Sequence, residues 1–168
     1  MLVYWHKASL FLFRRKYTMG YNDGIIRWTK IATVLFMGMA VVADIFGWVI
    51  TKYIALCWAG VTEIGKMIAL AVVFYLGTVG GYVVLVSLFL LLTNMSKDKV
   101  FDRANTKLMA IITGALVAIA VDCIVGGFIW SGAWILAIVA LFMGLIVLSV
   151  KVVFDKAITM KEEMDLTI

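Results

Sequence analysis

Residues 67–93 form a run of 27 residues without a single charged side chain. About 20 apolar residues in a helix are enough to cross the roughly 30 Å of hydrocarbon in a bilayer. Only helices and closed barrels satisfy their backbone hydrogen bonds in lipid. Three more apolar stretches have a similar length, so the sequence predicts four membrane-spanning helices, at about residues 31–50, 67–93, 108–129 and 133–153.

Composition excludes a water-soluble globular domain. Of the 168 residues, 65% are hydrophobic and the mean hydropathy is +1.09, whereas soluble domains contain about 45–50% apolar residues. The chain has no proline, which argues against the broken helices that form the substrate sites of many transporters. Short connections between antiparallel spans favour an all-α membrane protein built as a four-transmembrane-helix up-down bundle.

The first residues differ from the spans. Residues 2–13 are apolar but too short to cross a bilayer, and they lead directly into three basic residues at 14–16. We therefore expect two parts, an N-terminal interfacial amphipathic segment over 1–24 and a transmembrane domain over 25–168 with a helical C-terminal tail. Residues 51–66 form either an interfacial helix or an extension of the first span.

The basic residues predict the orientation. Of the 15 Lys and Arg residues, 13 fall in residues 1–30, 94–107 and the tail from residue 151 onward, and only Lys52 and Lys66 fall in the other two connections. Lys and Arg are enriched in cytoplasmic segments of membrane proteins. We expect both termini in the cytoplasm, and the basic excess indicates topology rather than direct nucleic-acid binding.

Two acidic residues, Asp44 and Asp122, lie inside predicted spans. Both are about 20 Å from the predicted inner end of their span, and the same layer of the second span contains Tyr75. A phenol there can donate a hydrogen bond to a carboxylate, and two close carboxylates favour protonation of one. This arrangement predicts an intramembrane polar cluster. Alternatively, each Asp binds a local partner and only fixes the rotation of its helix.

Gly77 and Gly81 form a GxxxG pair in the second span. Small residues at this spacing let two helices approach closely. The pair therefore predicts either close packing inside the bundle or the face of a homo-oligomer.

The sequence offers little to catalysis. Cys57 and Cys123 lie at different predicted depths, and His6 has no second histidine, cysteine or acid at a ligand spacing. No spacing typical of a metal site, a phosphate-binding loop or a catalytic triad occurs. We expect a non-enzymatic protein without a metal or cofactor.

The connection at 94–107 and the C-terminal tail carry a resemblance. The residues are Val100, Phe101, Asn105 and Leu108 before the third span, and Ala157, Glu163, Asp165, Leu166, Thr167 and Ile168 at the end of the chain. This pattern resembles the YoaS-like family of small bacterial four-span membrane proteins of unknown function, over about residues 25–168. Ala104 and Met164 depart from it, since the family has an acidic residue and an asparagine there.

Members of that family often lie beside a gene for a helix-turn-helix DNA-binding protein. The resemblance therefore implies a membrane protein that restrains a cytoplasmic regulator. We expect partner binding through Phe101, Asn105 and the four residues Asp165, Leu166, Thr167 and Ile168, although these last four can also pack back onto 94–107. Asp102 is expected to cap the third span.

Three functions remain open at this point. The first is a regulatory or interaction protein whose inner face binds a cytoplasmic or membrane protein. The second is a small transporter or an ion- or proton-responsive subunit that uses Asp44, Tyr75 and Asp122. The third is an immunity or assembly subunit that docks on a larger membrane complex.

Overall fold

The computed structural model describes residues 2–97 and 102–165, and for residues 2–23 and 165 it describes the backbone alone. This part of the chain contains helices and no strand: α1 (Leu2–Ile45), α2 (Gly47–Tyr53), the π-helix η1 (Ile54–Trp58), α3 (Ile64–Met95), α4 (Arg103–Gly127) and α5 (Gly132–Asp165). Four segments are long and apolar enough to cross a membrane: Gly24–Ile45, Ile64–Met95, Arg103–Gly127 and Gly132–Met164. The prediction of an all-helical chain with four apolar helices is confirmed.

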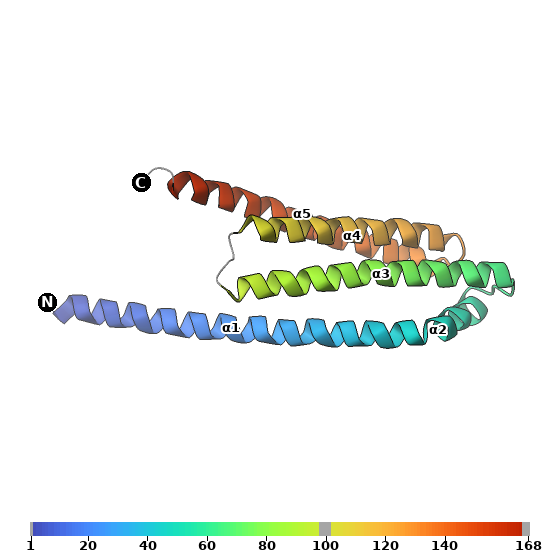
Figure 1. Ribbon diagram of the computed structural model, residues 1–168, viewed down its shortest axis with the longest axis horizontal. Helices are drawn as coiled ribbons and strands as arrows, with labels where there is room; N and C mark the ends of the chain where they lie inside the picture. Colours follow the sequence, from blue (N-terminus) through green and yellow to red (C-terminus); the bar gives the residue numbers. More distant parts are fainter. Residues whose placement is uncertain (1, 98–101, 166–168) are drawn as a thin grey trace.

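The four long helices run up and down beside one another (Figure 1). The start of α1, the end of α3, the start of α4 and the end of α5 lie at one end, which we call the terminal end. The opposite end, which we call the far end, holds α2 and the turn between α4 and α5. This up-down order of the helices is the one that the sequence predicts. That the terminal end faces the cytoplasm stays a prediction.

The helices pack in series. The most extensive contacts join α4 to α5 and α3 to α4, and smaller ones join α1 and α2 to α3. Within the described residues, α1 and α5 share no comparable contact. The arrangement within the described residues is therefore an open row of antiparallel helices.

Small residues form the contacts between neighbouring helices. Ala133, Ala137 and Ala140 of α5 are buried at helical spacing, and a Cβ atom at Gly80 of α3 would lie 2.6 Å from the side chain of Ile119 in α4. In a membrane, helices associate through close packing, which small residues allow. The two tightest interfaces therefore depend on alanine and glycine.

The first span ends earlier than predicted. The regular helix α1 stops at Ile45, and residues 47–53 form the separate helix α2. A Cβ atom at Gly47 would lie 2.8 Å from the Tyr75 hydroxyl and 2.9 Å from Phe74. The absence of a side chain at Gly47 therefore lets α2 approach Phe74 and Tyr75 of α3 closely. Residues 51–66 include the end of α2, η1 and the start of α3, so neither expected form describes them fully.

The backbone of α1 is continuous through residue 24, where the sequence predicts a change from interfacial segment to span. Its first half extends past the ends of α3 and α4 (Figure 1). The position of residues 1–24 relative to a lipid surface stays a prediction.

Candidate functional site

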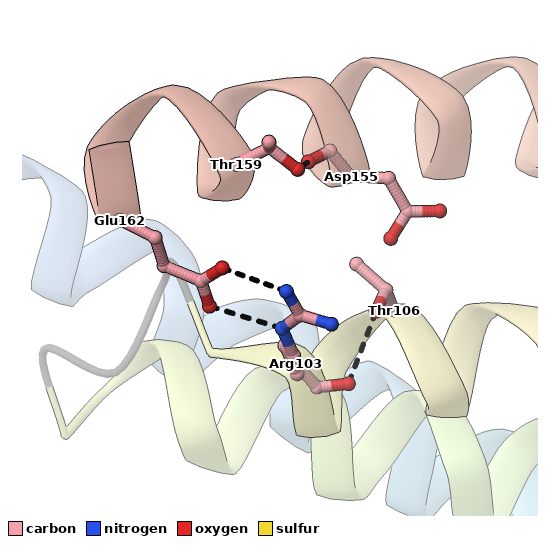
Figure 2. A network of polar contacts seen from close by, with 5 residues as sticks. All are labelled: Arg103, Thr106, Asp155, Thr159 and Glu162. Carbon is pink, nitrogen blue, oxygen red and sulfur yellow. Dashed lines mark hydrogen bonds and ion pairs between the residues drawn. The ribbon is translucent and has the colours of Figure 1, made fainter. Parts of the chain in front are cut away.

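The end of α5 lies against the first turn of α4 at the terminal end (Figure 2). At 1.5 Å per residue, the 34 residues of α5 span about 51 Å, well over the roughly 30 Å of hydrocarbon. The Arg103 guanidinium donates to both carboxylate oxygens of Glu162, from Nε at 2.9 Å and from the second nitrogen at 2.7 Å. This bidentate ion pair holds the end of α5 level with the start of α4.

The charges of this pair stabilise one another. The guanidinium of Arg103 holds the pKa of Glu162 below its ordinary value, and Glu162 in turn raises the pKa of Arg103. About two turns back along α5, a hydrogen bond from Lys151 lowers the pKa of Asp155. Lys151 Nζ lies 2.8 Å from the Asp155 carboxylate. The α4–α5 contact is therefore ionic in the neutral pH range.

Next to these charged groups, the interface between α4 and α5 contains buried residues. Ile158 of α5 is only 4% exposed, and Thr106 of α4 is buried, with its hydroxyl donating to the Arg103 carbonyl at 3.0 Å. The C-terminal extension of α5, residues 153–164, therefore packs against the start of α4. Whether residues 165–168 pack back onto 94–107 or bind a partner stays a prediction, because their side chains lie outside the described residues.

Asp102 begins α4 as predicted. Its side chain accepts a hydrogen bond from the Ala104 backbone N–H at 3.0 Å, so it caps the first turn of the helix.

Asn105 occupies a different environment from the one we expected. Its side chain is fully buried, and its Oδ1 accepts a hydrogen bond from Asn94 Nδ2 of α3 at 3.0 Å. A residue enclosed between α3 and α4 cannot contact a partner without local unfolding. We therefore correct its predicted role: Asn105 joins two helices. The other predicted partner residues, Phe101, Asp165, Leu166, Thr167 and Ile168, lie outside the residues whose side chains the structure describes.

The extension of α5 also has an exposed apolar stripe, which the sequence analysis missed. Val153, Met160 and Met164 are 65%, 58% and 63% exposed, and Ala157 lies between them at helical spacing. At 100° per residue, these four positions fall within about 60° of one another and opposite Ile158 and Glu162. The helical spacing of these apolar residues is visible in the sequence, but charged residues lie between them along the chain.

At the far end, the structure places two tyrosines beside Asp44. The Tyr75 hydroxyl donates to the Asp44 backbone carbonyl at 3.2 Å, and the Tyr82 hydroxyl donates to Asp44 Oδ2 at 2.8 Å. Tyr75 therefore lies at the expected level, but the phenol that binds the carboxylate belongs to Tyr82. The two tyrosines share a helix face but differ in depth by about 10 Å, so matching depths selected Tyr75 and missed Tyr82.

Asp122 lies on another side of α3. Its Oδ2 would be 3.3 Å from a Cβ atom at Gly77, so the carboxylate lies against the α3 backbone. Asp44 Oδ1 and Asp122 Oδ2 are both buried and have no hydrogen-bond partner among the described residues. The predicted single cluster is thus two separate carboxylates, one beside the tyrosines and one beside the glycines.

The predicted glycine pair does not make the closest helix contact. Gly77 faces Asp122, and a Cβ atom at Gly81 would meet nothing within 4 Å. Gly80 approaches α4 instead. The GxxxG spacing identified the correct helix but not the face that packs.

A family model described as a protein of unknown function (DUF2975) matches residues 49–168. The chain belongs to this family. No curated protein and no solved structure matches the chain significantly.

The DUF2975 match separates the two groups of polar residues. The Arg103–Glu162 pair, the buried Asn94–Asn105 contact and Asp122 all lie within the matched residues. Asp44 and the whole of α1 lie before them. The DUF2975 match therefore covers most of α2 and the helices η1, α3, α4 and α5, and α1 precedes it and packs on α3.

Proposed function

We propose that this protein is a YoaS-like, non-enzymatic protein of the bacterial plasma membrane, with both termini in the cytoplasm, and that it regulates a cytoplasmic partner protein. The four apolar helices support insertion in a membrane. The 13 basic residues in segments at the terminal end, against two in the other connections, support the orientation.

The observation that carries partner binding is the exposed stripe of the α5 extension, formed by Val153, Ala157, Met160 and Met164. Arg103 and Glu162 lie level with it, so most of the stripe is beside charged groups and not in hydrocarbon. The opposite face of the extension is already used against α4. An apolar helix face in a polar environment is typical of helices that bind in a groove of another protein.

The groups flanking the stripe favour one kind of partner. Lys156 and Lys161 are exposed next to it, so the matching surface is an apolar groove with acidic residues at its rim. Methionine side chains adapt to grooves of different shape. The genetic neighbourhood implied by the family resemblance makes a helix-turn-helix regulator the partner that we expect.

Site-specific photocrosslinking tests this proposal. A photoreactive residue replaces Met160 in the full chain in its native membrane, and a matched variant carries it at Thr159, which is exposed but lies outside the stripe. We expect a discrete soluble protein to be crosslinked from position 160 and not from 159. Equal products from both positions, or none from 160, would contradict partner binding by the stripe. A crosslink to an integral membrane complex would favour an immunity or assembly role.

A second candidate is an ion- or proton-responsive subunit, and the buried, unpartnered oxygens of Asp44 and Asp122 favour it. Buried ionisable groups within membrane helices are commonly functional. We expect proton flux into liposomes that contain the protein, and we expect Asp122→Asn to reduce it. Flux equal to that of empty liposomes would exclude this candidate.

A further inference from the structure

A cavity of about 360 Å³ lies at the far end, in the space that the serial packing leaves between α1 and α5. Ala40 of α1 lines one side, Ala133 and Leu136 of α5 line another, and Gly77 and Gly81 of α3 lie between them. This volume falls within the range of about 300–1,000 Å³ that is typical of small-molecule sites. The missing side chains of the glycines keep the space open, since a Cβ atom at Gly81 would meet nothing.

One polar group that lines this cavity, the Asp122 carboxylate, lacks a hydrogen-bond donor for one of its oxygens. The hydroxyls of Thr51 and Thr78 donate to carbonyls of their own helices. Asp122 Oδ2, by contrast, is buried without any hydrogen-bond partner. A carboxylate oxygen in an apolar environment is unfavourable unless a donor or a cation compensates it. Among the residues whose side chains are described, no Lys or Arg lines the cavity to supply a cation.

The aromatic residues in the cavity wall also favour a cationic ligand. Phe74 and Trp130 both line the cavity, and the faces of aromatic rings attract cations. The remaining walls are aliphatic, with Leu70 and Val73 among them. A carboxylate, two aromatic rings and an aliphatic surface together complement a molecule with an apolar body and one cationic head.

We propose that this cavity is a binding site for a lipophilic amine in its protonated form, whose N–H donates to the Asp122 carboxylate. The ligand reaches the site from the far end, because Asp122 lies five residues, or about 8 Å, from the end of α4. The apolar body lies between α3 and α5. The site does not depend on partner binding by the α5 stripe, so either proposal can fail without the other.

A pair of probes of equal shape tests the site. N,N-dimethylbenzylamine is protonated at neutral pH, and isobutylbenzene has the same shape with C–H in place of the charged N–H. Each is titrated by ligand-observed NMR against the full chain in nanodiscs, with empty nanodiscs as the control for lipid partition. We expect the amine to bind about tenfold more tightly than the hydrocarbon or better. Equal affinity, as for a site that takes lipid tails, or no binding above empty nanodiscs, would overturn the proposal.

Two variants assign the affinity to the site. Asp122→Asn should remove the difference between the probes, whereas Asp44→Asn should keep it, because Asp44 does not line the cavity. Gly81→Leu fills the cavity without altering the carboxylate and should abolish binding of both probes. A preference for the amine that survives Asp122→Asn, or amine binding that survives Gly81→Leu, would overturn the proposal. If Asp122→Asn fails to fold, the result for Gly81→Leu decides.

Discussion

Replacing Asn105 by alanine should destabilise the terminal end more than any exposed substitution there. Asn105 is fully buried and accepts a 3.0 Å hydrogen bond from Asn94. Removing the acceptor leaves the half-buried Asn94 amide without this partner, which costs about 1–3 kcal/mol. The lost atoms leave a small cavity that adds about 1 kcal/mol. We therefore expect a loss of about 2–4 kcal/mol in the free energy of unfolding.

The assay is reversible unfolding of the full chain in bicelles by steric trapping, with a double-mutant cycle. Asn94→Ala, Asn105→Ala and the double variant are compared, because the cycle isolates the pair from the other contacts of Asn105. We expect a coupling energy of about 1 kcal/mol or more. Thr113→Ala is the matched control, since its hydroxyl bonds only within α4, to Met109, and it should change stability by less than about 0.5 kcal/mol. Additive single effects, or an Asn105→Ala loss no larger than that of the control, would refute the reasoning.

Three more predictions concern the terminal end and the orientation. Ile158→Ala should cost about 2–4 kcal/mol in local stability and remove hydrogen-exchange protection from the α5 extension; unchanged protection would show that Ile158 does not hold it. Because the pKa of Glu162 is lowered by Arg103, the ion pair is complete at neutral pH and is lost as the pH falls through the lowered value, below the usual carboxyl range near 4. A spin label at Met160 should therefore become more mobile at acid pH, and Glu162→Gln should make it equally mobile at all pH values. Cys57 is exposed at the far end, so an impermeant thiol reagent should label it in intact cells that carry Cys123→Ala; labelling only after lysis would reverse the predicted topology.

The sequence predicts the helices well because the bilayer imposes a simple rule. Absence of charge over residues 67–93 locates α3 within a few residues of both ends. The break at Phe46 escapes this rule, since no charge or proline marks it. Apolar residues are favoured both in lipid and at helix contacts inside the protein, so hydropathy alone does not show where α1 ends and α2 begins.

The site is predicted less well, because side-chain partners depend on helix rotation. Depth along the spans correctly brings Tyr75 to Asp44 but cannot show that Tyr82 reaches the carboxylate or that Asp122 lies beside Gly77. Asn105 lies among charged residues of a predicted loop, and its enclosure by Asn94 depends on how closely α3 and α4 approach. A period of 3.6 residues predicts which residues share a helix face. It does not predict which neighbouring helix that face contacts.

The continuity of α5 has a mechanical consequence. This one helix carries the exposed methionines at its C-terminal end and, near its N-terminal end, Ala133 and Leu136 in the cavity wall. It contains no proline that would act as a hinge. A rigid rod of about 51 Å that pivots by 3° about its middle moves each end by about 1.3 Å in opposite directions. In such a pivot, a shift of the C-terminal end of α5 would move the cavity wall beside Asp122 in the opposite direction.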